Sequence, residues 1–141
     1  DIVVSDRITY HDFDISAFGN PRDFSDKNRY VFKSDTKLID AFKSLKHKDR
    51  IWIGPIVSGN QFIHSENQIH TIQSFYPEAL ATEMEGASIA HICSEFKVPF
   101  IVIRSISDLV LNPKNEMTFD EYLLKASARS AQFCFEFVNT L

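Results

Sequence analysis

The sequence predicts an α/β fold: a three-layer helix/sheet/helix domain around a mixed, largely parallel central sheet that is incomplete at its N-terminus. Two observations predict this class. Apolar segments typical of strands alternate along the 141 residues with segments of helical periodicity. Residues 98–103 also form a nearly continuous apolar run, as expected of a strand buried on both faces. We therefore expect one domain over residues 1–141.

The first part of the chain predicts a strand, a loop and a helix. Residues 1–5 form an apolar run with no preceding turn or cap, which indicates that the chain is a piece of a longer protein. Residues 18–35 are rich in Asn, Asp, Ser and Pro and predict a loop within the domain. A helix should follow, because four apolar residues recur there at helical spacing: Leu38, Ile39, Phe42 and Leu45.

The middle of the chain predicts a strand, a helix and a second strand. Residues 51–58 are typical of a strand that is broken or bulged at Gly54 and Pro55. Ser65 and Gln68 have the spacing of a capping box, which predicts a helix that continues to about Phe75. Residues 80–83 then predict a short strand.

Two more helices are expected on either side of the apolar run. Residues 85–96 are helix-forming, with Ala90, Cys93 and Phe96 on one face. Thr118 and Glu121 have the spacing of another capping box, which predicts a final long helix. Four residues should line one side of that helix: Leu123, Ala126, Phe133 and Phe137.

Composition and charge argue against several classes of partner. The formal net charge is −4 and the basic residues are scattered, so neither nucleic acid nor a membrane surface is expected to bind. With no signal peptide and no apolar run of about 18 residues, the cytoplasm is the expected compartment. Cys93 and Cys134 should be buried free thiols there. The 13 Phe residues indicate an apolar surface that a partner subunit would cover.

Neither a metal nor a cofactor is expected. The five histidines show no spacing typical of zinc ligands. The four glycines form neither a phosphate-binding loop nor a Gly-x-Ser-x-Gly elbow. Metal-dependent and nucleoside-triphosphate-dependent enzymes are therefore disfavoured.

Acidic and basic residues follow two of the predicted strands. Open α/β sheets bind their ligands at the carboxyl ends of the strands. We therefore expect five residues to converge on one crevice: Glu83, Glu85, Arg104, Ser107 and Asp108. From spacing alone, the acids fit solvated turn residues or a helix cap equally well, and Arg104 fits a structural ion pair.

Three segments resemble the 5′-methylthioadenosine/S-adenosylhomocysteine nucleosidases of the purine nucleoside phosphorylase/uridine phosphorylase superfamily. Residues 58–63, 82–87 and 98–108 look like successive signatures of these enzymes, in matching order and spacing. Residues 1–19 are similar to a further segment. The resemblance spans the whole chain but only about the last three-fifths of the family's length. It implies that residues 1–141 are the C-terminal part of a nucleoside phosphorylase-like domain.

The resemblance and the chemistry of the reaction imply the same catalytic roles. The family hydrolyses an N-glycosidic bond and releases adenine, and this requires an acid that protonates the purine as the bond lengthens. Asp108 matches that acid, and Ser107 can hydrogen-bond and orient it. Glu85 matches the carboxylate that accepts hydrogen bonds from the ribose 2′ and 3′ hydroxyls. Its negative charge would also favour the developing ribosyl cation.

Further residues match the family's binding contacts. Met84 would lie against the sugar, Phe62 would stack on the base, and the backbone of Ile63 would read the adenine edge. An aromatic residue or Met at such a position is otherwise a core residue. The remaining matches are Glu83 as a further substrate-binding residue, Arg104 holding the attacking water or pairing with a nearby carboxylate, Phe119 over the alkylthio end, and Phe18 reaching into a neighbouring subunit's site.

Departures from the family pattern leave other functions open. Asn60 stands where Asp is common, Gly86 stands where Ala is common, and residues 18–31 differ in sequence. The family's water-activating Glu has no counterpart in this chain. A purine or uridine phosphorylase, a hydrolase of futalosine or adenosine monophosphate, and a non-catalytic nucleoside-binding module remain alternatives. In each case we expect a second copy of the chain, a missing N-terminal segment, or both, as partner.

Overall fold

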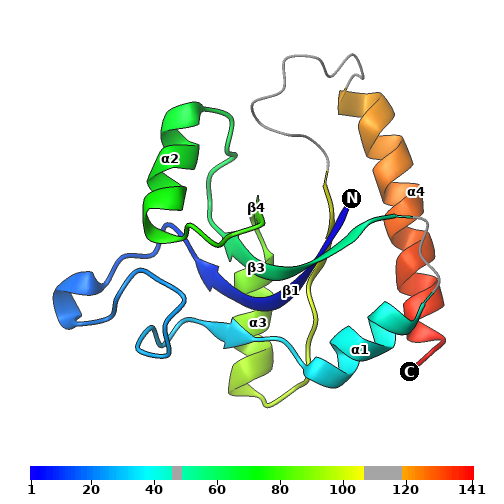
Figure 1. Ribbon diagram of the computed structural model, residues 1–141, viewed down its shortest axis with the longest axis horizontal. Coiled ribbons are helices and arrows are strands. Elements are labelled where there is room, and N and C mark those ends of the chain that lie inside the picture. Colours follow the sequence, from blue (N-terminus) through cyan, green and yellow to red (C-terminus); the bar gives the residue numbers. More distant parts are fainter. Residues whose placement is uncertain (46–48, 107–118) are drawn as a thin grey trace.

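The computed structural model describes residues 1–45, 49–106 and 119–141 (Figure 1). Five strands in these ranges form one sheet, with the path β2-β1-β3-β4 and with β5 also paired to β1. The longest ladder joins β1 (Ile2–Tyr10) and β3 (Ile51–Ser58) in parallel, and β4 (Ala81–Glu83) extends it in parallel. The short strands β2 (Phe32–Lys33) and β5 (Ile103–Ser105) run antiparallel to β1. The expected mixed, largely parallel sheet is confirmed.

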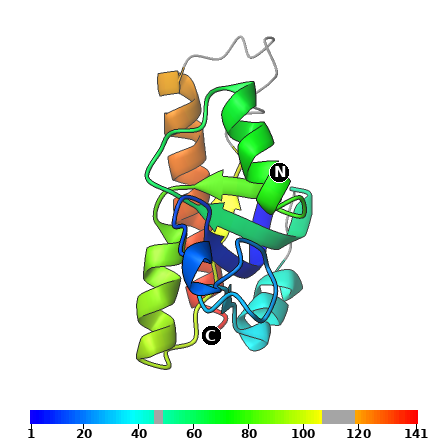
Figure 2. The same ribbon diagram turned by 90° about the vertical axis from the view of Figure 1, so that its left-hand side faces the viewer.

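Helices cover both faces of this sheet. On one face, Ala87 and Ala90 of α3 (Gly86–Glu95) pack against four buried strand residues: Val3 and Ile8 of β1, Phe32 of β2 and Ile56 of β3. On the other face, Ile2 and Val4 pack with α1 (Thr36–Ser44) and α4 (Phe119–Val138) through Ile39, Phe42 and Phe137. Figure 2 shows α3 and α1 on opposite sides of the sheet. The three layers predicted from the sequence are present.

A bulge in β1 makes these two cores possible. Between Ser5 and Ile8 the register with β3 shifts, so that three steps along β1 match two steps from Gly54 to Ile56. Because side chains alternate between faces, residues 3 and 8 could not otherwise share a face. The irregularity expected at Gly54 and Pro55 is therefore found there, but the extra residue belongs to β1.

The capping box predicted at Ser65 and Gln68 is confirmed. α2 (Glu66–Phe75) begins at Ser65, which forms a reciprocal capping box with Gln68. The side chain of Asp35 caps α1 by accepting from the backbone N–H of Leu38. Phe133 and Phe137 lie on one side of α4, as expected, and that side packs on α1, with Phe137 buried. Thr118 and the side chains of Leu123 and Ala126 lie outside the described residues.

The apolar run at residues 98–103 is not a strand buried on both faces, so that prediction is wrong. The strand comprises only Ile103–Ser105, each partly buried. The preceding residues form an extended connection after α3, and Val98 is 52% exposed. The run is apolar because it passes both cores: Phe100 and Val102 pack on one, and Ile101 and Ile103 on the other.

Two predictions about side-chain burial are also wrong. Phe96 is 75% exposed, because it is the C-cap of α3 and lies beyond the helical face that Gly86, Ala87 and Ala90 bury. Cys134 is exposed on α4 and Cys93 is partly buried; both are free thiols. In the described part of the chain, no helix is long and apolar enough to cross a membrane.

Candidate active site

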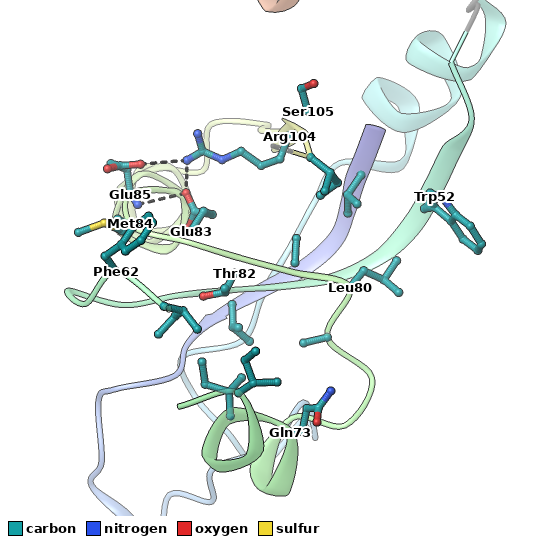
Figure 3. A pocket seen from close by; sticks show the side chains of 18 of the residues that line it. Trp52, Phe62, Gln73, Leu80, Thr82, Glu83, Met84, Glu85, Arg104 and Ser105 are labelled. Atoms are coloured by element: carbon teal, nitrogen blue, oxygen red, sulfur yellow. Dashed lines mark hydrogen bonds and ion pairs between the residues drawn. The ribbon is translucent and has the colours of Figure 1, made fainter. Parts of the chain in front are cut away.

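A pocket of about 770 Å³ lies beside β3, β4 and α2 (Figure 3). Residues from the segments that follow β3 and β4 line this pocket, together with residues of β5. Six residues singled out from the sequence line it: Phe62, Ile63, Glu83, Met84, Glu85 and Arg104. Ser107 and Asp108 lie outside the described residues. The predicted convergence is thus found for Glu83, Glu85 and Arg104.

The position of Arg104 in the sheet differs from the expected one. It lies in the middle of β5, which runs antiparallel to β1, so it does not stand at the carboxyl end of a parallel strand. Its guanidinium pairs with the carboxylate of Glu83 and lies 3.1 Å from Oε2 of Glu85. The length of the Arg side chain, rather than the strand-end rule, brings the charges together.

Glu83 is the most constrained carboxylate of the pocket. Its side chain is 8% exposed and accepts hydrogen bonds from the backbone N–H groups of Glu85 (3.1 Å) and Gly86 (2.8 and 2.9 Å). It also accepts from the Ser58 hydroxyl and from Arg104. Burial raises the pKa of Glu83, but these donors outweigh burial and lower the pKa below its usual value. Glu83 is therefore an ionised acceptor at neutral pH and not a proton donor.

Glu85 is the open carboxylate. Its side chain is 65% exposed at the pocket, and its residue is the N-cap of α3. No side-chain cap bond forms there. Apart from its contact with Arg104, its oxygens can therefore accept hydrogen bonds from a bound diol.

Phe62 and Met84 supply apolar surface beside these charges. Phe62 is 66% exposed, with its ring stacked on His64, and Met84 is 43% exposed. Figure 3 shows both side chains next to Glu85 at one end of the pocket. Their exposure argues against the alternative that they are core residues. Ile63, by contrast, is only 8% exposed and counts among the buried residues.

The loop that carries Phe62 and Ile63 begins at a tight contact. A Cβ added to Gly59 would overlap the imidazole of His11, so this close approach requires glycine. His11 is buried, and burial, together with Arg22, lowers its pKa against the opposing effects of Asp12 and Glu83. His11 is therefore a neutral support beneath the loop.

Sequence reasoning missed the supporting residues Ser58 and His11. Both stand inside segments that match the family, Ser58 just before Gly59 and His11 just before Asp12. A polar residue at the end of an apolar strand was the available signal. Their partners Glu83 and Gly59 are distant in sequence, so only the fold reveals the contacts.

Two predicted contact residues do not contribute a described side chain to this pocket. Phe18 ends a short 3₁₀ helix (Ser16–Phe18), is 83% exposed and does not line the pocket. Phe119 begins α4, and its side chain lies outside the described residues. Among the described residues, no group of three His, Cys, Asp or Glu could hold a metal ion.

Comparisons with known proteins show the family to which the chain belongs. The family model described as the phosphorylase superfamily matches residues 1–139. The 5′-methylthioadenosine/S-adenosylhomocysteine nucleosidase of Desulfotalea psychrophila is 40% identical, over 100% of this chain and 61% of its own length. The chain thus spans about three-fifths of the length of this relative.

Solved structures show the same similarity. The Streptococcus pneumoniae MTA/SAH nucleosidase in complex with 8-aminoadenine matches with a TM-score of 0.84 and 35% identity, over 100% of this chain and 61% of that one. The Neisseria meningitidis nucleosidase in complex with methylthio-immucillin-A matches with a TM-score of 0.86 and 36% identity, over 100% and 62%. The resemblance inferred from the sequence motifs is confirmed.

Proposed function

Because the chain belongs to the phosphorylase superfamily, we propose that the protein hydrolyses the N-glycosidic bond of 5′-methylthioadenosine and S-adenosylhomocysteine and releases adenine. One observation carries the proposal. An open carboxylate, Glu85, stands beside the ion pair of Glu83 and Arg104 in a pocket that also exposes Phe62 and Met84. A nucleoside site requires an acceptor for the ribose diol and an apolar surface for the base. This pocket offers both, beside a pair of opposite charges. Similarity to the nucleosidases over the whole chain supports the same substrate class.

Glu85 binds the ribose in this proposal. An ionised carboxylate only accepts hydrogen bonds, and the vicinal 2′ and 3′ hydroxyls offer two donors. As the bond to the base lengthens, positive charge develops on the sugar, and the nearby carboxylate stabilises it. Glu83 contributes to the same binding site through its ion pair with Arg104. Phe62 stacks on the base, Met84 covers the ribose, and the Ile63 backbone reads the adenine edge.

Asp108 is the proposed general acid, oriented by a hydrogen bond from Ser107. The bond between C1′ and N9 breaks, and its electron pair moves into the purine, which takes a proton from Asp108 at N7. Water then forms the new bond to C1′ and loses a proton. Arg104 orients this water by donating a hydrogen bond to it. The proton passes to the family's water-activating Glu, which has no counterpart in this chain and would come from an N-terminal segment of the protein.

The assembly is also part of the proposal. Phe119 would close over the 5′ alkylthio end, and Phe18 would reach into the pocket of a second copy. The 83% exposure of Phe18 supports the latter role. A partner is thus a second copy, an N-terminal segment, or both. The two free thiols support a reducing, cytoplasmic setting.

Adenine release tests the function. The protein that carries this chain is incubated with methylthioadenosine or S-adenosylhomocysteine, with and without inorganic phosphate, and the products are separated by chromatography. We expect adenine and a free sugar at a rate that phosphate does not change. A strict requirement for phosphate, with a sugar 1-phosphate as product, would instead identify a phosphorylase. Binding of the nucleoside without any adenine release would identify a binding module.

A further inference from the structure

The N-terminus of α3 is capped by residues outside the helix. A helix leaves its first backbone N–H groups without internal partners, and the N-cap side chain normally accepts one of them. Glu85, the N-cap of α3, makes no such bond. The Glu83 carboxylate instead accepts hydrogen bonds from the backbone N–H groups of Glu85 and Gly86. The Ser58 hydroxyl accepts one from the backbone N–H of Ala87, with 2.7 Å between N and Oγ.

The Ser58 hydroxyl both donates and accepts a hydrogen bond. Ser58 is the last residue of β3, 1% exposed, and pairs directly with Glu83 in the parallel ladder. Because Oγ already accepts from Ala87, its hydrogen is available to donate, and the ionised Glu83 carboxylate can only accept. The hydroxyl therefore links β3, β4 and the start of α3 at a single point.

We propose that Ser58 is a positioning residue of the active site, which holds the Glu83 carboxylate against Arg104 and, with Glu83, replaces Glu85 in the cap of α3. The consequence is that the Glu85 carboxylate stays available to the ligand. This inference rests on the proposed function, because it assigns Ser58 a role in the same site.

The charged groups around Glu83 explain why one hydroxyl matters. Arg104 faces it from β5, Glu85 from the start of α3, and His11 from the segment after β1. Burial favours the protonated form of Glu83, and the hydrogen bond from Ser58 is the largest of the contributions that oppose burial. His11 is neutral at pH 7, because its pKa is lowered, and contributes no compensating charge. Loss of the Ser58 donor should raise the pKa of Glu83 and weaken its pair with Arg104.

The test compares Ser58→Ala with a matched control, Ser5→Ala. Ser5 is also a fully buried strand serine, and its hydroxyl has no hydrogen-bond partner in the described part of the chain.

The titration of the Glu83 carboxyl is followed by carbon NMR, and adenine release is measured against pH. In Ser58→Ala we expect the midpoint of Glu83 to rise by on the order of one pH unit. We expect kcat to fall roughly tenfold or more, with a smaller change in KM, and the acid limb to move to higher pH. Ser5→Ala should match the wild type, and Ser58→Thr, which keeps a hydroxyl, should recover most of the loss.

Each result decides the inference. A folded Ser58→Ala with unchanged Glu83 titration overturns it, whether or not activity falls, since lost activity alone would indicate a structural role. If Ser58→Ala does not fold, Ser58→Cys retains a weak donor and should give an intermediate rise, and a wild-type titration in that variant overturns the inference. If the wild type releases no adenine, the proposed function fails, yet the Glu83 titration still shows whether Ser58 holds this carboxylate.

Discussion

The two carboxyl groups of this pocket, those of Glu83 and Glu85, differ in burial and in hydrogen-bond partners. Glu83 is buried among donors and stays ionised, whereas Glu85 is exposed and has acceptor capacity to spare. Glu83 is not suited to donate a proton at neutral pH, because its pKa is lowered. The proposed division of labour therefore needs a third carboxyl as acid, and Asp108 is the candidate from the sequence.

Replacement of Asp108 by Asn should lower kcat about 10²- to 10⁴-fold. The amide can still hydrogen-bond to the purine but cannot protonate it, so KM should change much less. Steady-state adenine release measures both constants. Asp26→Asn removes a carboxylate from a surface pair with Lys33 and should leave them unchanged. Unaltered turnover in Asp108→Asn would exclude Asp108 as the acid.

Glu83 should make stability depend on pH in the acid range. Its pKa is lowered in the folded state from the usual value of 4.5. Its contribution to the free energy of unfolding is therefore complete above pH 4.5 and is lost as pH falls from there through the folded pKa. Glu83→Gln should be less stable than the wild type near pH 7, and urea titrations should show this difference shrinking below pH 4.5.

The control for this pH effect is the exposed Glu95 of α3. Its side chain is 71% exposed. Glu95→Gln should follow the wild type at every pH, because an exposed carboxyl contributes little to folding. A stability difference between Glu83→Gln and the wild type that stays constant from pH 7 to pH 3 would contradict the assignment.

The element that delivers Phe62 and Ile63 depends on Gly59. In Gly59→Ala, the new methyl group would overlap the His11 ring, so the loop after β3 must move. We expect a loss of about 1–3 kcal/mol in stability, as in other overpacked sites, together with weaker adenine binding. Urea unfolding and calorimetry measure the two effects.

Gly19→Ala is the matched control for the loop. Gly19 has a φ of 82° but no atom within 4 Å of an added Cβ, so its replacement should cost stability through backbone strain alone. Adenine binding should then be unchanged. A second change, His11→Ala, should restore part of the binding that Gly59→Ala loses. Equal binding by Gly59→Ala and the wild type would show that the His11 contact does not place the loop.

α1 and α4 hold one face of the sheet through aromatic packing. Phe42 of α1 is fully buried, and its ring lies 5.6 Å from that of Phe137 and 6.5 Å from that of Phe133. Phe42→Ala should therefore lower the free energy of unfolding by about 3–5 kcal/mol. Phe135 of α4 is 72% exposed, so Phe135→Ala should change the free energy of unfolding by less than about 0.5 kcal/mol. Similar values for both variants would mean that α4 does not pack on α1 in solution.

At the scale of the whole molecule, α3 presents an apolar surface to solvent. Ile89 and Ile92 are 59% and 60% exposed, and Phe96 beyond them is 75% exposed. Large exposed apolar patches usually mark contact sites. We therefore predict that the protein is found with a partner, a second copy or an N-terminal segment, that buries on the order of 1,000 Å² or more.

Sedimentation tests this assembly. Ile92→Glu should weaken it, whereas Lys37→Glu, an exposed change on α1, should not. A stable monomer of this chain alone, with one sharp unfolding transition, would refute the prediction.

Several features follow from the sequence by itself, because their causes are local. Alternation of apolar runs with helical periodicity predicts the α/β class, and the pair Ser65 and Gln68 predicts the start of α2. The segments that resemble the nucleosidases are short and contiguous, so they identify Glu83, Glu85 and Arg104 without any structure. Periodicity, caps and motifs all depend on residues a few positions apart.

Only the tertiary structure decides which distant residues meet. The apolar run at residues 98–103 predicts a buried strand, because apolarity alone does not reveal that its side chains pack on two different cores. The bulge in β1, the antiparallel direction of β5 and the exposure of Phe96 likewise depend on contacts across the chain. The same is true of Ser58. It lies 25 positions from Glu83, and only the pairing of β3 with β4 brings its hydroxyl to that carboxylate.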